Sequence, residues 1–207
     1  MHRRTALSVS AALLAAAPLL SACSGETRPG TAAVVGGERI TTSALQAQVK
    51  DVRTAQNRSE NAAELIQATP GLDRTKLNRM IQSAVLERAA KSAGVSVSTK
   101  EIEDFRKAQL QQAGTPAALE AAALQQAQLA PGQMDANTRF NLLRDKLFDH
   151  YGSQEKALTE LSAAAKALHV EVNPRYGTWD AQQIVLGDSQ TPWITQVTRP
   201  EQPPAGA

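Results

Sequence analysis

The chain has 207 residues, with 22 basic and 20 acidic side chains and a formal net charge of +2. It has one cysteine and only 3% aromatic residues, which excludes a disulfide within the chain and leaves few large side chains for a rigid core. The near-neutral balance also excludes a strongly basic surface of the kind that binds nucleic acid.

The first 22 residues have the order of a secretory signal peptide. Arg3 and Arg4 form a positive start, Ala6–Leu20 is apolar and uncharged, and small residues follow. This apolar run is shorter than the roughly 20 residues of a membrane-spanning helix, so a permanent anchor is the weaker alternative. A twin-arginine export signal stays open, although Thr5-Ala6-Leu7 fits that pattern poorly and favours the general secretory route.

Leu20-Ser21-Ala22-Cys23 resembles the lipobox of bacterial lipoproteins. The resemblance implies lipid attachment to Cys23 and cleavage just before it; a small buried cysteine is the alternative. We therefore expect residues 1–22 to be a lipoprotein signal peptide and residues 23–31 to be the lipidated cysteine and a tether. The product would lie at the extracytoplasmic face of the cell membrane. Removal of Arg3 and Arg4 would leave 20 basic against 20 acidic residues.

The N-terminal half predicts two short strands followed by helices. Residues 32–35 and 38–40 flank the Gly36-Gly37 turn, and Thr41 is the expected N-cap of the first helix. Residues 60–68 predict a short helix, and Asp73 is the expected N-cap of a long amphipathic helix that ends at Gly94. The apolar faces of the two longer helices are formed by Leu45, Val49 and Val52 and by Leu77, Met80, Ile81, Ala84 and Val85.

The C-terminal half predicts four more helices and a return strand. Ser98 and Glu101 form a capping box, and Thr115-Pro116 opens an Ala/Gln-rich helix over residues 117–128. Two further amphipathic helices carry Phe140, Leu143, Leu147 and Tyr151, and then Leu158, Leu161, Ala165 and Leu168. Residues 169–173 alternate as a strand does, and residues 181–207 read as a mobile Pro/Gln-containing tail.

These patterns predict one mainly α domain over residues 32–180, with a small two- or three-stranded β element joining its ends. Val34 and Val35 should lie beside Val170 and Val172, because an isolated strand needs partners for its backbone groups.

Three stretches resemble landmarks of the SurA/PrsA-type extracytoplasmic chaperones. They are the strand and turn at residues 33–41, the helix, glycine stop and Val-x-Val link at residues 77–98, and the return strand at residues 170–180. The resemblance implies a helical SurA N-terminal-like domain that binds unfolded or newly exported proteins. Only residues 152–168 occupy the interval where isomerase members carry a parvulin domain, so we expect no prolyl isomerase activity.

We expect no catalytic, cofactor-binding or metal-binding residue and hence no enzyme. His150 and His169 lack partners at metal-ligand spacing, and Glu101, Glu103 and Asp104 suit the first turn of a helix for dipole reasons alone. Phosphate-loop and serine-elbow motifs are absent from the sequence, so no small-molecule substrate is indicated. Tyr176 and Trp179 form either a peptide-contact patch or a packed corner over the small sheet; the packed corner is favoured.

The leading functional hypothesis is a membrane-tethered, ATP-independent holdase for exported proteins. The alternative is an adaptor lipoprotein that binds one specific partner in the cell envelope. If the chain binds clients, residues 60–71 and 114–133 are the candidate binding segments, because their apolar patterning is weakest and breaks are most frequent.

Overall fold

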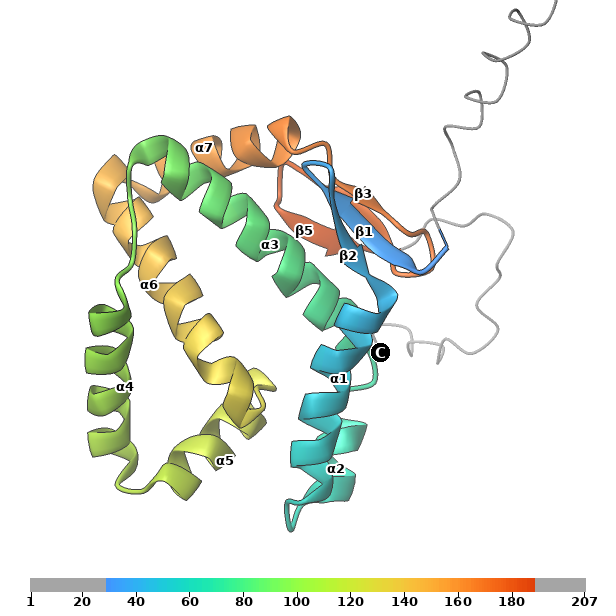
Figure 1. Cartoon of the computed structure of the whole chain (residues 1–207), viewed down its shortest axis with the longest axis vertical. Helices are drawn as coiled ribbons and strands as arrows, with labels where there is room; N and C mark the ends of the chain where they lie inside the picture. Colours follow the sequence, from blue (N-terminus) through green and yellow to red (C-terminus); the bar gives the residue numbers. More distant parts are fainter. Residues whose placement is uncertain (1–28, 189–207) are drawn as a thin grey trace, which may run out of the picture.

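The computed structural model describes residues 29–188, so Cys23 and the signal segment lie outside the described residues, as does the chain after Asp188. Figure 1 shows α3 (Leu72–Ala93) running across the top of an arch. On one side descend α1 (Thr42–Asn57) and α2 (Ala62–Gln67). On the other side lie α4 (Thr99–Ala113), α5 (Pro116–Ala127) and α6 (Met134–Tyr151), with the 3₁₀ turn η1 (Pro131–Gln133) before α6. α7 (Gln154–Ala167) returns along the top toward the strands.

A three-stranded antiparallel sheet joins the two ends of the domain. β1 (Thr31–Val35) lies between β2 (Glu38–Thr41) and β3 (Glu171–Val172). Ala33 pairs with Val172, and Val34 pairs with Glu171. Gly36 has a positive φ of 60° in the β1–β2 turn, and its N–H donates to the Leu168 carbonyl at 2.7 Å. The predicted joining of the two valine-rich segments is confirmed.

The hydrophobic core lies around α3. Leu77, Ile81 and Val85 are fully buried at i, i+4 and i+8, which places them on one face of the helix. They pack in one cluster with buried side chains of the sheet, α1, α6 and α7, including Ala33, Leu45, Leu143, Leu147, Leu161 and Ala165. Each fully buried aliphatic side chain of this size contributes roughly 1.5–3 kcal/mol. A second cluster of Val52, Leu72, Leu124 and Ala130 joins α5 to α1 and to the start of α3.

The helix starts follow the local sequence, with one correction. Thr41 accepts a hydrogen bond from the Ala44 N–H, and Ser98 and Glu101 form the predicted capping box. However, α3 begins at Leu72, with Gly71 in the N-cap position, so the prediction that Asp73 is the N-cap was wrong. Burial of Leu72 in the second core cluster accompanies a helix start two residues earlier than an Asp73 N-cap would give.

A second, two-stranded sheet extends the ordered domain past residue 180. β4 (Thr178–Asp180) pairs with β5 (Val185–Gly187), which the sequence analysis had placed in the tail. Polar side chains of α3 hold β5 in place: Arg74 Nη2 donates to the Gly187 carbonyl, and Asn78 Oδ1 accepts from the Leu186 N–H, both at 2.9 Å. These partners lie more than 100 residues away in sequence, so the local pattern of residues 181–188 does not reveal them.

Within residues 29–188, no helix is both long enough and apolar enough to cross a bilayer.

Candidate functional site

α4 lies on the outside of the arch and is attached mainly at its first turn. None of its side chains is fully buried. Lys146 of α6 donates to Glu101 Oε1 at 2.6 Å and to the Ser96 carbonyl at 2.8 Å. The hydrogen bonds from Lys146 and from Ser98 lower the pKa of the Glu101 carboxyl to about 2. Further along α4, the Arg106–Asp135 ion pair at 3.1 Å is exposed and adds little.

An apolar groove of about 440 Å³ runs between α4, α5 and η1, and we call it the outer groove. Leu110 in this groove is 37% exposed, and Phe105 on the same helix is 38% exposed. A smaller cavity of about 190 Å³ lies between α5 and α6 and shares Leu119 and Met134 with the groove. α5 is therefore loosely packed on both sides. The outer groove is lined by Arg106, Lys107, Leu110, Pro116, Leu119, Glu120, Pro131, Gly132 and Met134.

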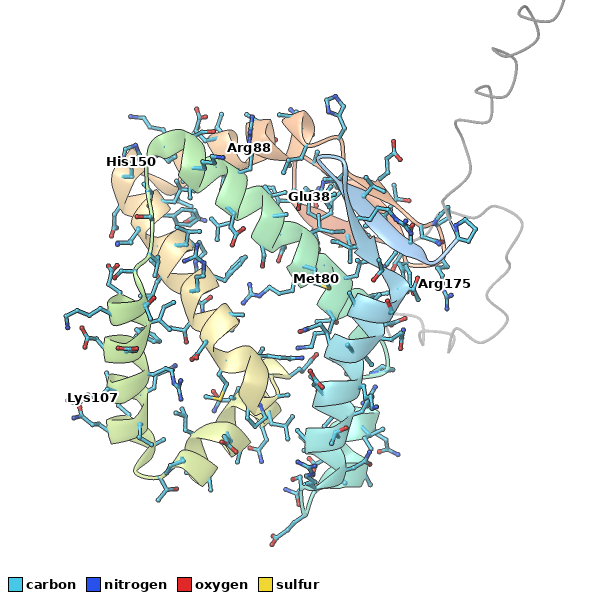
Figure 2. The ribbon with its side chains drawn as sticks, viewed as in Figure 1. Glu38, Met80, Arg88, Lys107, His150 and Arg175 are labelled. Carbon is cyan, nitrogen blue, oxygen red and sulfur yellow. The ribbon has the colours of Figure 1, made fainter. Side chains whose placement is uncertain are left out.

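A second concavity of about 230 Å³, the inner cleft, lies between α1, α3 and α6 on the inside of the arch. Figure 2 labels Met80 on the part of α3 that lines it. Lys76 and Arg79 are its charged residues, and both are cations. The inner cleft is lined by Gln48, Lys76, Arg79, Met80, Ser83, Leu129, Gln133, Ala136, Asn137 and Phe140.

Lys76 is 7% exposed, and its hydrogen-bond acceptors within residues 29–188 are neutral. Its Nζ donates to the Gln128 carbonyl at 2.8 Å and to Gln133 Oε1 at 2.7 Å, and Gln133 Nε2 donates to the Gln48 carbonyl at 2.9 Å. Burial and the nearby Arg79 guanidinium lower the pKa of Lys76 to about 8, while Asp51 acts weakly in the opposite direction. The amine is thus a buried cation without a carboxylate in hydrogen-bond contact.

Arg79 lies flat over the Phe140 ring, with its guanidinium carbon 3.7 Å from the ring centroid. Its Nη2 donates to Asn137 Oδ1 at 2.5 Å, which is again a neutral acceptor. Burial and the charge of Arg144 lower the pKa of Arg79. Because a guanidinium stays protonated in proteins, the inner cleft keeps a positive charge at neutral pH.

The family model of the SurA-like N-terminal domain matches residues 4–148, which is more than half of the chain. The chain belongs to the SurA-like N-terminal domain family. This relationship is to a chaperone-type, non-catalytic domain. The match covers β1 through nearly all of α6, including both concavities, and ends before α7. No curated protein and no solved structure matches the chain.

In this SurA-like domain, the two candidate binding segments differ in how firmly they are held. Residues 62–67 form α2, and Arg53 of α1 holds the end of this helix. Arg53 Nη1 donates to Thr69 Oγ1 at 2.7 Å, and Arg53 Nη2 donates to the Thr69 carbonyl at 2.6 Å. Gln56 donates to the Leu65 carbonyl at 3.2 Å. Residues 116–133 instead form α5 and η1, which border both the groove and the smaller cavity. The second segment is the better candidate for an adaptable surface.

The SurA-like domain does not present Tyr176 to solvent. Tyr176 is 1% exposed and packs in the main core, and Trp179 is half-buried against it. This placement matches the packed corner rather than the peptide-contact patch, and it follows from the area that two aromatic rings bury over a small sheet. Cys23, the expected lipid attachment residue, lies outside the described residues.

The other singled-out residues have structural roles in the SurA-like domain. His150 lies at the end of α6 and meets Tyr151 edge-to-face at 5.0 Å, and His169 contacts the Ala167 carbonyl at 3.0 Å. Glu101 caps α4, and Asp104 pairs with Lys100 one turn away. Among residues 29–188, no three His, Cys, Asp or Glu side chains are grouped as a metal site would require.

Lys76 and Arg79 were missed by the sequence analysis, although a signal for Lys76 is present. Lys76, Met80 and Ser83 recur at i, i+4 and i+7, next to the buried stripe of Leu77 and Ile81. A lysine at the edge of an apolar helix face indicates either a long side chain reaching solvent or a buried amine with partners. Those partners, Gln128 and Gln133, come from a distant turn that periodicity does not place.

Proposed function

We propose that this protein is a membrane-tethered, ATP-independent holdase for newly exported proteins. The observation that carries the proposal is the outer groove: an apolar concavity of about 440 Å³ beside a helix that has no fully buried side chain. Unfolded chains expose apolar side chains, and an uncovered apolar surface is a common feature of binding sites. SurA-like domains in general bind unfolded or exported proteins, which supports the same conclusion.

α4 and α5 are loosely attached to the rest of the domain, which would let them bind clients of different shapes. α4 is held at its first turn, and α5 has cavities on two sides and a single fully buried residue, Leu124. Elements with few buried contacts open at low free-energy cost, so they adapt to side chains of different size. A rigid pocket would favour one partner instead.

The proposed activity does not include prolyl isomerisation. Between α6 and β3 the chain contains α7 alone, with Gln154–Ala167 as its bounds. This supports the expectation that no parvulin domain occupies the interval. The proposal also places the protein on the extracytoplasmic face of the membrane, held by lipid on Cys23.

An aggregation assay tests the holdase proposal. The chain from residue 23 to 207, carrying Cys23→Ser, should slow aggregation of several unrelated, chemically unfolded clients at near-stoichiometric ratios without nucleotide. Leu110→Gln should weaken this effect severalfold, because it removes apolar contact surface from the outer groove. Leu158→Gln is the matched control: this leucine of α7 is 43% exposed but lies outside the outer groove.

Two outcomes contradict the proposal. Absence of suppression across all clients favours the adaptor alternative, in which one specific envelope partner is bound. Equal suppression by the Leu110→Gln and Leu158→Gln variants removes the outer groove as the binding surface. A parallel assay with a proline test peptide should give the uncatalysed isomerisation rate, and acceleration of that rate would contradict the absence of isomerase activity.

A further inference from the structure

We infer that the inner cleft is a carboxylate subsite, which binds an aspartate or glutamate side chain of a client together with one apolar neighbour. The inference rests on the proposed function, because it names the client chemistry that a chaperone of this kind would select. It concerns a surface separate from the outer groove: residues of the cleft come from α1, α3, α6 and the turn before α6.

The charge of the cleft is the first argument. Of its ten lining residues two are charged, Lys76 and Arg79, and both are positive. Their side-chain hydrogen bonds within residues 29–188 go to neutral acceptors: the Gln128 carbonyl, Gln133 Oε1 and Asn137 Oδ1. A carboxylate entering the cleft would therefore meet two cations that no acidic side chain of the cleft neutralises.

The surrounding charged groups leave this complementarity in place. Asp51 on α1 favours the charged form of Lys76, but its influence is smaller than that of burial and of Arg79. From α6, Arg144 adds a further positive charge near Arg79. The two lining cations and Arg144 thus favour an anion over a cation, and Asp51 offsets them only in part. Burial is the main cause of the lowered pKa of Lys76, and the charge of Arg79 adds to it.

The apolar wall is the second argument. Met80, Phe140 and Leu129 line the cleft beside the two cations, and Arg79 is stacked on the Phe140 ring. The volume of about 230 Å³ equals that of roughly eight water molecules. This space suits one acidic side chain and one apolar side chain of an extended peptide, and it is too small for a folded surface element.

Matched peptides test the inference. Fluorescent ten-residue peptides, acetylated and amidated to remove both terminal charges, would carry Leu-Asp-Phe or Leu-Asn-Phe at the centre. Fluorescence anisotropy with the chain from residue 23 to 207, carrying Cys23→Ser, should give a Kd at least fivefold lower for the aspartate peptide. A third peptide, with asparagine at the centre and a free C-terminal carboxylate, should bind like the asparagine peptide.

Variants assign the preference to the cleft. Lys76→Met and Arg79→Gln should each reduce the aspartate preference to less than twofold. Two variants are used because either one remains informative if the other loses its fold. Arg88→Gln is the control, because Arg88 is an exposed arginine of the same helix, labelled in Figure 2 at the end of α3 away from Met80.

Equal affinity for the aspartate and asparagine peptides overturns the inference, as does a preference that both Lys76→Met and Arg79→Gln retain. Tight binding of the free C-terminal carboxylate overturns the choice of a side chain as the ligand. Failure of the holdase proposal is distinguishable: an aspartate preference that depends on Lys76 and Arg79, without aggregation suppression, supports the subsite and rejects the holdase. Suppression that depends on Leu110, without aspartate preference, does the reverse.

Discussion

Folding and protonation are coupled at Lys76. Its pKa falls from 10.5 to about 8 because the amine is buried near Arg79. Between these two values the unfolded chain binds more protons than the folded chain, so the free energy of unfolding rises with pH. Below pH 8 both states hold the proton, and Lys76 contributes no pH dependence.

This coupling predicts a measurable difference between two proteins. The free energy of unfolding of the wild type, minus that of Lys76→Met, should rise by about 2 kcal/mol from pH 7.5 to pH 9.5 in urea titrations. Subtraction removes the other titrating groups, and the same comparison with Lys91→Met, an exposed lysine of α3, should give a flat difference. A flat difference for Lys76 would show that its folded-state pKa is not depressed.

Residue-level features were predictable where they depend on near neighbours. Thr41, Ser98 and Glu101 cap their helices through partners three residues away, so the sequence reveals them. Lys76 depends on Gln128 and Gln133, which are 52 and 57 residues away. The position of Tyr176 could not be predicted either, because a tyrosine suits both a surface contact and a core. The structure shows that Tyr176 packs in the main core.

The β4–β5 hairpin is an element whose stability comes from α3. Three polar side chains of that helix bond to β5 or to its neighbours: Arg74 to the Gly187 carbonyl, Asn78 to the Leu186 N–H, and Gln82 to the Ile184 carbonyl at 2.9 Å. Each such bond contributes about 1 kcal/mol, and Leu186 adds buried apolar area.

A truncation pair tests this anchoring. A chain ending at Asp180 should be less stable by about 3 kcal/mol than a chain ending at Asp188, measured by urea unfolding. In the longer chain Asn78→Ala and Gln82→Ala should each cost about 1 kcal/mol, and in the shorter chain they should cost almost nothing. Equal costs in both chains would mean that these side chains stabilise α3 by another route.

The β1–β3 pairing could be predicted from the sequence, whereas β5 and the inner cleft could not. The β1–β3 pairing was predictable because two valine-rich segments were the best strand candidates in a helical chain. β5 contains Val185 and Leu186 but follows polar Gln182 and Gln183, so its periodicity is weak. The inner cleft was equally hidden, since it forms where three helices and a turn meet.

At the scale of the whole molecule, lipid attachment at Cys23 would set the distance between the domain and the bilayer. β1 begins at Thr31, so eight peptide units separate the cysteine from the first strand and reach at most about 30 Å. Mass spectrometry of the protein from intact cells should find an N-terminal, acylated Cys23. Cys23→Ala should abolish both the lipid and the cleavage at that site.

The outcome is decisive in either direction. A mature N-terminus at another residue, with an unmodified thiol at position 23, would reject the lipid anchor. The proposed holdase activity would not be affected by that result, because its assay uses the Cys23→Ser chain without lipid.

If the chain is exported as proposed, the order β2–β1–β3 also has a consequence for the timing of its folding. β1 meets β2 after a two-residue turn, but its other edge is filled by Glu171 and Val172, more than 130 residues later. In a chain that crosses the membrane N-terminus first, the central strand therefore waits with one open edge until nearly the whole domain has emerged. Such long-range closure slows folding. If Cys23 is lipidated as proposed, this delay would give the lipid-transferring enzyme time to act on a cysteine only eight residues before that strand.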